Sequence, residues 1–437
     1  MPITVTAIFD IGKTNKKFFL FDHDFQVVHR ESIQISEVKD EDGFPTEDLN
    51  ALVIWIKEVI SRMLDIEKYQ IKHFNFATYG ASLVHIDDEG KVLTPLYNYL
   101  KPIDQVIISN FFQTYGPEED LSRVTGSPNS GMLNSGMQLF WLKQTLPIIF
   151  KRIKYSLHLP QYLSYVFTGI PVSEYTSIGC HTALWDYSKE DYHAWVYREE
   201  MDKVLAPIVV AKTNYPTQFN GREIKIGVGL HDSSSSLIPY LKSFSEPFIL
   251  LSTGTWSVSL NPFSKEFLTD EDVLAGGINY MTVDGKAVRA SRLLLGKEYT
   301  HQLGILKEKY GVADNSLESF EFNRDIFDRI SKKHERRFNW KFLPDTNLSG
   351  RSDFSSYSYD EAIHQLIMEL VQEQIKNIEV ARGGMTSIKR VLVDGGFNNN
   401  NVFMSTLALM ISDCEIVSAD ASVGSALGAA MILSDSE

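Results

Sequence analysis

The chain has 437 residues, a formal net charge of −14 and two cysteines. Because one hydrophobic core rarely serves more than about 300 residues, we expect two domains of roughly 200 residues each. The negative charge argues against a nucleic-acid or anionic-membrane binder, since both need a basic face. Cys180 and Cys414 indicate neither a disulfide framework nor a zinc site, and buried thiols in a reducing compartment are expected. No apolar run of about eighteen residues occurs, which predicts a cytoplasmic protein without a membrane span.

The first apolar run of the chain ends in a carboxylate and a basic turn. Apolar residues 7–9 lead into Asp10, and an apolar run returns over residues 18–21, which predicts a β-hairpin. A glycine in the turn lets backbone N–H groups face outward, so the tip suits a phosphate chain, and Asp10 suits Mg²⁺ bound through water. A plain hairpin with a solvated turn fits these residues equally well. The turn consists of Gly12, Lys13, Thr14, Asn15, Lys16 and Lys17.

The letters Gly12-Lys13-Thr14 also occur in Walker A loops. That loop needs a glycine five positions earlier, where this chain has Ala7, and a helix afterwards, where this chain has a strand pattern. A P-loop is therefore excluded.

The following segments have the order of an α/β domain. Residues 26–35 alternate as a third strand, and the acidic turn 39–43 is expected to be solvated. An amphipathic helix follows from an N-cap at Thr46, and residues 73–78 form a strand parallel to the first. Residues 105–212 are expected to be mostly helical, with aromatic side chains in the core.

The same order recurs in the second half of the chain. Strands over residues 247–252 and 256–260 flank the small polar turn Thr253-Gly254-Thr255. A long amphipathic helix with apolar residues from Ile363 to Ile378 then precedes a strand over residues 390–393. Two halves of one plan, each with a phosphate-type hairpin, imply a nucleotide in the cleft between the domains.

Two further segments complete the predicted nucleotide site. Gly395 and Gly396 follow an apolar strand, and with Asn398 they mark the expected place of the adenosine. An asparagine-capped turn into a helix is the alternative for these residues. Residues 423–430 are rich in small side chains and predict a closely packed helix.

His231 and Asp232 stand between the two halves. The simplest interpretation makes Asp232 the N-cap of a helix. A carboxylate beside a phosphate site would also orient an alcohol and accept its proton during transfer from ATP. Asp232 can serve as cap and base together.

These motifs resemble the FGGY carbohydrate kinases of the sugar kinase, actin and chaperone ATPase superfamily, and among them L-rhamnulokinases most. The family motif Asp-x-Gly-Thr-Thr/Ser-x-x-Arg is similar to residues 10–17, with Lys17 in place of the arginine. Residues 78–82 resemble Thr-Trp-Gly-Val-Asp, although Ser82 replaces the aspartate, and Tyr99 and Lys101 replace a tryptophan and an aspartate. Three more similar motifs follow in order, at residues 174–176, 231–235 and 252–257.

The resemblance implies an α/β fold of two ribonuclease H-like, actin-like ATPase domains, residues 1–244 and 245–437, with a nucleotide cleft between them. It implies an ATP- and Mg²⁺-dependent kinase that acts on a terminal hydroxyl of a ketose, L-rhamnulose first, with L-fuculose, xylulose or ribulose as alternatives. A nucleotide-binding sensor without catalysis is the rival of a different class. The implied partner is a small-molecule sugar, and the implied assembly is a monomer or homodimer.

The resemblance also assigns roles to residues. Asp232 is the implied catalytic base, and Asp10 and Asp232 are the implied metal residues. The implied sugar site comprises Gly80, Ala81, Ser82, Glu174 and His231. The implied nucleotide site comprises Gly12, Lys13, Thr14, Asn15, Lys17, Gly254, Thr255, Gly395, Gly396 and Asn398.

Overall fold

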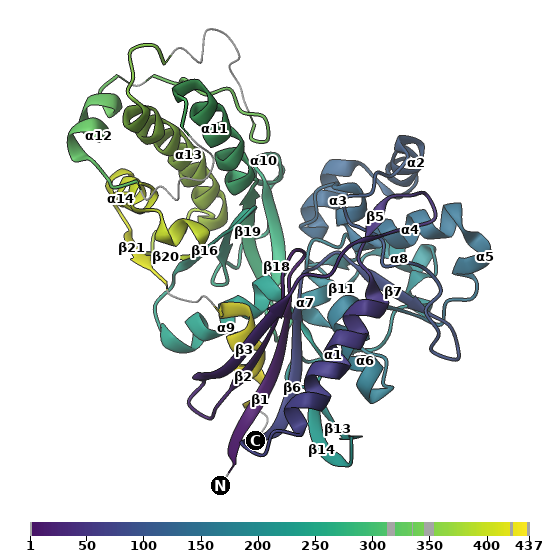
Figure 1. Cartoon of the computed structure of the whole chain (residues 1–437). Helices are drawn as coiled ribbons and strands as arrows, with labels where there is room; N and C mark the ends of the chain where they lie inside the picture. The colour runs from purple at the N-terminus through teal and green to yellow at the C-terminus, as the bar shows by residue number, and fades with distance from the viewer. Residues whose placement is uncertain (1, 313–319, 334, 345–353, 420–422, 435–437) are drawn as a thin grey trace.

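The computed structural model describes residues 2–312, 320–333, 335–344, 354–419 and 423–434. These residues form two lobes, each built on a mixed β-sheet with helices against it (Figure 1). No helix in the described ranges is long and apolar enough to cross a membrane. Cys180 is buried, as expected, whereas Cys414 is half-buried, and both are free thiols.

The first sheet has the strand order β13-β14-β6-β1-β2-β3, and β15 also pairs with β6. The predicted hairpin is confirmed: β1 runs antiparallel to β2, with Asp10 opposite Lys17 near the turn. β1 is also parallel to β6, as expected. The strands are β1 (Ile3–Ile11), β2 (Lys16–Phe21), β3 (Val27–Ile33), β6 (Tyr69–Thr78), β13 (Asn214–Phe219), β14 (Arg222–Gly227) and β15 (Leu230–His231).

One face of this sheet is covered by α1 (Leu49–Leu64) and α6 (Leu159–Thr168), which share its aromatic core. The predicted N-cap of α1 is wrong. Asp48 is the cap, and its carboxylate accepts a hydrogen bond from the N–H of Ala51. Thr46 is instead buried in a short strand, and its hydroxyl donates to the carbonyl of Leu96.

The segment between β6 and β13 is mostly helical, as predicted, and forms the outer part of the first lobe (Figure 1). Its aromatic side chains, among them Phe111, Phe140 and Trp195, pack into a core of their own. The helices are α2 (Gln105–Tyr115), α3 (Glu118–Thr125), α4 (Ser135–Thr145), α5 (Pro147–Phe150), α7 (Tyr175–Ile178) and α8 (Ala194–Arg198). The short strands are β4 (Val38–Lys39), β5 (Pro45–Thr46), β7 (Leu83–Ile86), β8 (Tyr155–His158), β9 (Ser173–Glu174), β10 (Trp185–Asp186), β11 (Asp191–Tyr192) and β12 (Ile208–Val209).

The second sheet has the order β18-β19-β17-β16-β20-β21 and contains the second predicted hairpin, β16 and β17. Its strands are β16 (Ile249–Thr253), β17 (Ser257–Asn261), β18 (Gly277–Met281), β19 (Ala287–Leu293), β20 (Arg390–Gly395) and β21 (Glu415–Ser418). The predicted long helix is α13, and the helices of this lobe are α10 (Asp270–Leu274), α11 (Leu295–Tyr310), α12 (Arg324–Ser331), α13 (Tyr359–Arg382) and α14 (Asn401–Met410).

The two sheets repeat one plan. In each, a hairpin is flanked by a third antiparallel strand on one side and by a parallel strand on the other. A last parallel strand, β15 or β21, then leads toward the helix α9 (Asp232–Ser243) or α15 (Gly424–Ser434). The repetition that the sequence pattern indicated is therefore present in the fold.

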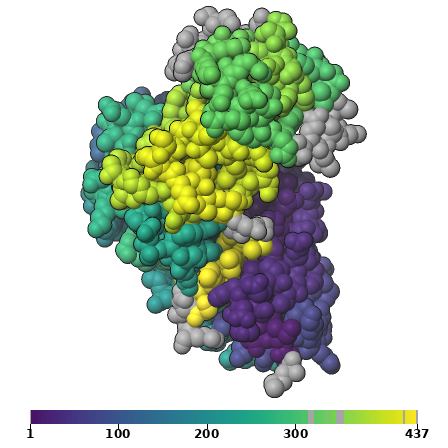
Figure 2. Space-filling view, turned by 90° about the vertical axis from the view of Figure 1, so that its left-hand side faces the viewer, coloured from purple at the N-terminus to yellow at the C-terminus, as the bar shows by residue number. Residues whose placement is uncertain are grey.

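The helices α9 and α15 pack closely against each other between the lobes. A side chain at Gly428 would overlap the backbone carbonyl of Ser235, so this crossing needs glycine. Although α15 is the last helix among the described residues, its apolar side packs on the first sheet. Ala429 belongs to the same hydrophobic core as Ile8 and Phe21. Figure 2 shows α15 in yellow beside the N-terminal strands in purple.

Candidate active site

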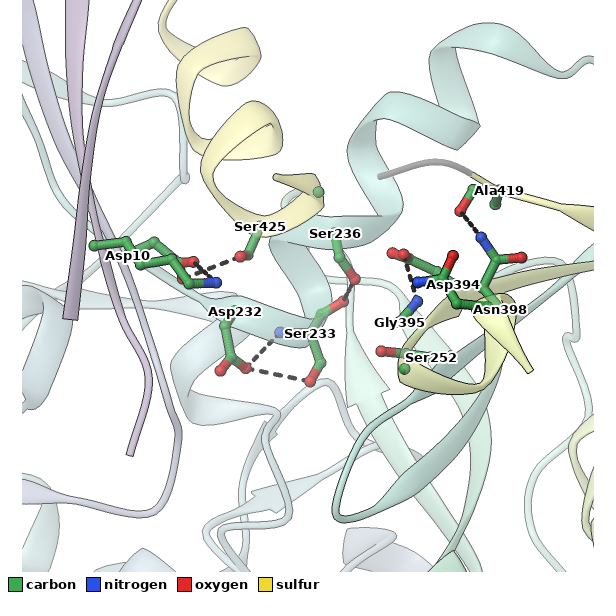
Figure 3. Close-up of a pocket in the computed structure, with 14 residues that line it drawn as sticks. Asp10, Asp232, Ser233, Ser236, Ser252, Asp394, Gly395, Asn398, Ala419 and Ser425 are labelled. Atoms are coloured by element: carbon green, nitrogen blue, oxygen red, sulfur yellow. Dashed lines mark hydrogen bonds and ion pairs between the residues drawn. The ribbon is translucent and has the colours of Figure 1, made fainter. Parts of the chain in front are cut away.

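A polar cavity of about 510 Å³ lies between the lobes. Figure 3 shows its two walls: Asp10, Asp232 and Ser233 on one side, and Ser252, Asp394, Gly395 and Asn398 on the other. Lys17, Gly396 and Ser425 also line it. We call it the central cavity.

Two further cavities adjoin the central cavity and share lining residues with it. One, of about 630 Å³, shares Gly396 and is also lined by Gly254, Thr255 and Phe342; we call it the outer cavity. The other, of about 140 Å³, shares Ser233 and is also lined by Gly80 and His231; we call it the small cavity. The cleft thus offers three adjoining compartments, with the central cavity between the other two.

Asp10 is held at the end of β1 by two partners. Lys17 Nζ lies 3.7 Å from its Oδ2, and the hydroxyl of Ser425 donates to its Oδ1 at 3.0 Å. Burial raises the pKa of Asp10 and the charge of Asp232 raises it further, whereas Lys17 and Ser425 lower it. The nearby positive charge therefore does not fully compensate the two carboxylates, which fits a divalent cation at this place.

Asp232 is the first residue of α9 rather than its N-cap, so the predicted cap is wrong. His231, with an extended backbone, occupies the cap position. The Oδ1 of Asp232 accepts hydrogen bonds from the N–H of Ser233 at 2.6 Å and from its hydroxyl at 3.2 Å. Desolvation in the cleft raises the pKa of Asp232 to about 6, which suits a general base at neutral pH.

His231 connects Asp232 with the small cavity. Its Nε2 lies 3.2 Å from Oδ1 of Asp232 and 3.1 Å from Sγ of Cys180, and its ring stacks on Tyr280 at 5.4 Å. Burial lowers the pKa of His231 to about 3, so the ring is neutral. A side chain at Gly80 would overlap Sγ of Cys180, so this contact explains the glycine.

Glu174 lies behind the site and does not line any of the three cavities. It caps α7: its Oε2 accepts hydrogen bonds from the N–H groups of Thr176 and Ser177 and from the Thr176 hydroxyl. The same hydroxyl accepts a hydrogen bond from the N–H of His231 at 2.9 Å. Glu174 therefore positions the backbone that precedes Asp232, and burial raises its pKa to about 7.

The tip of the first hairpin lies outside the three cavities, apart from Lys17. The residues concerned are Gly12, Lys13, Thr14 and Asn15. Lys13 pairs with Glu37 at 3.2 Å, and the amide of Asn15 accepts a hydrogen bond from Gln34. Lys16, expected to supply positive charge at the tip, instead forms a buried ion pair with Glu47.

Residues 81, 82 and 101 also lie outside the small cavity. Ala81 has a left-handed backbone, and Ser82 is buried. Lys101 pairs with Asp40 and Asp42, each at 2.6 Å. Because Asp40 is buried by this pair, the expectation of a solvated turn at residues 39–43 is wrong for Asp40. Ser82, Tyr99 and Lys101 replace residues of the family motifs. Of these three, Tyr99 alone lines the small cavity.

The second wall is built largely from backbone. Gly395 has a φ of 89°, and a side chain there would overlap the carbonyl of Thr253. The Asn398 amide donates to the carbonyl of Ala419, and its buried Oδ1 has no hydrogen-bond partner within the described ranges. Asn400 caps α14 through the N–H of Phe403, which confirms the alternative of an asparagine cap at that residue.

Several lining residues were not assigned to the site from the sequence. Ser425 was placed in the small-residue helix and Asp394 at the end of a strand, but neither received a role. Arg292, Tyr280 and His181 line the small cavity, and the sequence carries no motif that would have identified them.

The central cavity suits phosphates as well as a cation. The helices α9 and α15 both begin there, and helix N-termini favour anions. Within the described ranges, no group of three His, Cys, Asp or Glu side chains is arranged to hold a metal ion alone. Mg²⁺ commonly binds through one or two carboxylates together with substrate phosphates and water, and Asp10 with Asp232 fits that role.

Two sheets of one plan, with helices starting at a shared polar cavity, define the class of two-domain actin-like ATPase folds. Two solved structures are similar over almost the whole chain. A carbohydrate kinase from Novosphingobium aromaticivorans is 23% identical with a TM-score of 0.79, over 100% of this chain and 92% of that one. A gluconate kinase from Lactobacillus acidophilus is 15% identical with a TM-score of 0.79, over 99% and 89%. They confirm the predicted fold.

The sequence comparisons agree with the resemblance seen in the motifs. Residues 5–215 are similar to the FGGY family of carbohydrate kinases, N-terminal domain. Rhamnulokinase from Halalkalibacterium halodurans is 26% identical over 266 residues, which are 57% of this chain and 52% of that protein. The match spans about half the length of this relative.

Proposed function

We propose that this protein is a carbohydrate kinase that transfers the γ-phosphoryl group of ATP to a terminal hydroxyl of a sugar. The observation that carries the proposal is the position of Asp232. It lines the phosphate-sized central cavity, and its Oδ1 lies 3.2 Å from His231, which lines the small cavity. A base is needed where two such compartments meet, and a sensor that only binds nucleotide has no use for one.

In the proposed reaction the sugar occupies the small cavity, the phosphates the central cavity and the adenosine the outer cavity. The hydroxyl oxygen bonds to the γ-phosphorus, while the bond from that phosphorus to the bridging oxygen of ADP breaks. Asp232 accepts the hydroxyl proton. Lys17 and the N-termini of α9 and α15 stabilise the negative charge of the transferring group.

The nucleotide is held mainly by the second lobe in this proposal. Gly395 and Gly396 allow close approach of the nucleotide, and Asn398 lines the same wall of the central cavity. Asp10 and Asp232 would hold Mg²⁺, which would supply positive charge to neutralise the phosphates. Gly254 and Thr255 line the adenosine compartment.

The proposal also concerns which sugar accepts the phosphoryl group. The motif resemblance and the rhamnulokinase relative favour L-rhamnulose, and L-fuculose, xylulose and ribulose are the neutral alternatives. The relatives differ among themselves, since the similar solved structures include a gluconate kinase. The panel of acceptors must therefore include acids as well as ketoses.

The test is an ADP-release assay across that panel with MgATP, followed by mass spectrometry of the sugar product. We expect one acceptor class to stimulate ADP formation at least tenfold over water and to gain one phosphoryl group. ATP binding without stimulation by any acceptor would contradict the kinase and favour the sensor.

A further inference from the structure

The small cavity contains an arginine without a carboxylate partner. Arg292, near the end of β19, lines this cavity together with three tyrosines, a tryptophan and two histidines. Its guanidinium lies 5.1 Å from the ring centre of Trp256, and its Nη2 donates to the Ser130 hydroxyl at 2.8 Å. Within the described ranges no Asp or Glu forms an ion pair with it. Since a guanidinium has five N–H donors, most of them are available to a ligand.

The other cations of β19 and of the adjacent cavity, within the described residues, are paired with carboxylates. Arg289, three residues earlier on β19, pairs with Asp272 at 2.5 Å. Arg292 also lines an adjacent cavity, and there Arg336 and Lys376 pair with Glu373 at 2.7 and 2.9 Å. Arg292 differs from these structural cations because its free side faces space that a small molecule can occupy.

The other titratable groups of the small cavity do not offset this charge. His181 and His231 are neutral because burial lowers the pKa of each. The tyrosines are neutral at physiological pH, and burial raises the pKa of Tyr280 and Tyr99 further. Lys13, near the rings of Tyr79 and Tyr99, is already paired with Glu37. The lining therefore has one net positive charge, and a half-buried cation without an anion is unfavourable.

We propose that the acceptor is a sugar acid, whose carboxylate binds Arg292 while its terminal hydroxyl lies at Asp232. This inference rests on the proposed kinase function. Arginine binds a carboxylate through two parallel hydrogen bonds, which suits a planar group at one end of a small polyhydroxy chain. The carboxylate is unchanged in the reaction, which remains the hydroxyl phosphorylation described above. The class comprises aldonates and their keto derivatives.

The test compares acceptors of equal chain length with and without this carboxylate. Aldonates of five and six carbons are paired with neutral ketoses of equal length, and kcat/KM is measured with MgATP for the unaltered protein. The variants are Arg292→Met, which removes the charge, and Arg292→Lys, which keeps the charge but loses the paired geometry. Lys286→Met removes an exposed lysine that pairs with Asp284 on the turn before β19, and it controls for general charge effects.

We expect the unaltered protein to prefer acids. Arg292→Met should lower the acid-to-ketose ratio of kcat/KM by roughly 10- to 100-fold, the usual range for hydrogen bonds to a charged group, and Arg292→Lys should lie between. Lys286→Met should leave the ratio unchanged. A preference for ketoses in the unaltered protein, or an equal loss for both classes in Arg292→Met, would overturn the inference.

Direct binding separates this inference from the kinase proposal. Calorimetric titration of the aldonates without ATP should show binding that weakens from low to high salt and is lost in Arg292→Met. If acids bind in this way but no acceptor stimulates ADP formation, the kinase proposal fails and the anion site stands. If ketoses are phosphorylated while acids neither bind nor react, the kinase stands and this inference fails. If Arg292→Met does not fold, the inference is tested by the acid-to-ketose ratio of kcat/KM in Arg292→Lys and by the salt dependence of aldonate binding to the unaltered protein.

Discussion

The two walls of the cleft come from repeated units, yet they carry different chemistry. In the second pair from the turn of the first hairpin, Asp10 lies opposite Lys17, whereas the matching pair of the second hairpin is Ser252 and Val258. The Thr253 hydroxyl donates to the carbonyl of Asp394 and accepts from the N–H of Phe397. The first wall thus presents Asp10, Asp232 and Lys17 to the cavity, whereas the second presents one carboxylate, Asp394, beside neutral groups that fix a backbone turn.

This difference suggests a division of labour in the proposed kinase. Charged groups on the first wall act on the atoms that react, because their charge matters most in the transition state. A rigid backbone turn on the second wall binds the nucleotide, which changes less during the reaction. Variants on the first wall should therefore lower turnover, and variants on the second should weaken ATP binding.

The largest effect is expected for Asp232→Asn. The amide keeps the shape of the side chain but cannot accept the hydroxyl proton, so turnover should fall by roughly a hundredfold to ten-thousandfold. The Kd for ATP, measured by calorimetry, should change little. Near-normal turnover would show that the base lies elsewhere and that the first wall has no special role.

The two lysines of the first hairpin should differ in effect. Lys17 lines the central cavity 3.7 Å from Asp10, so Lys17→Met should lower kcat roughly tenfold to a hundredfold, at or below the usual cost of losing one charge-stabilising donor. Lys13→Met is the matched control. Lys13 lies outside the cavity and pairs with Glu37, and its loss should change kcat by about twofold at most. Equal losses of kcat in the two variants would contradict the assignment of Lys17, rather than Lys13, to the stabilisation of the transferring phosphoryl group.

On the second wall, Gly395→Ala should act on binding and stability. The φ of 89° is unfavourable for alanine, and the new methyl group would meet the carbonyl of Thr253. We expect a higher KM for ATP and a loss of about 1–3 kcal/mol in the free energy of unfolding. Gly384→Ala is the control, because Gly384 also has a positive φ, of 75°, but its Cβ would meet no atom within 4 Å. A lower kcat at unchanged KM would contradict the division between the walls.

Local sequence patterns were sufficient to predict the hairpins and the repeated order of the two halves. Alternating apolar residues and a polar turn define β1 and β2 because both strands lie next to each other in sequence. The arrangement of the small cavity depends instead on contacts between the lobes. Arg292 reaches it from β19, and no local signal in this strand distinguishes Arg292 from Arg289.

Side-chain partners explain the other differences between the prediction and the structure. The turn at residues 39–43 looked solvated because it is acidic, but Lys101, about sixty residues later, buries Asp40 in an ion pair. Asp48 rather than Thr46 caps α1 because the Thr46 hydroxyl is engaged by a distant carbonyl. Partners so far apart in the chain are not visible in a single sequence.

The smallest effect is expected for Glu174→Gln. Glu174 does not line the cavity but positions the backbone that precedes Asp232. Glu174 is buried, one of its oxygens has no hydrogen-bond partner among the described residues, and its pKa rises from 4.5 to about 7. The folded protein therefore favours the protonated form, and this contribution to stability is fully present below pH 4.5 and is lost as the pH rises through about 7. Glutamine is neutral at every pH and keeps an acceptor for Thr176. We therefore expect the variant to have a higher Tm than the unaltered protein at pH 8, by roughly 2–6 °C.

That difference should shrink as the pH falls toward 5.5, where Glu174 is itself protonated. Thermal unfolding of both proteins at pH 5.5, 7 and 8 measures it, and Glu223→Gln, at an exposed position on β14, controls for a general change in net charge. A lower Tm for Glu174→Gln at pH 8 would mean that the ionised carboxylate stabilises the fold through its three hydrogen bonds. In that case the position of His231 and Asp232 would depend on a charge behind the first wall as well as on the charges within it.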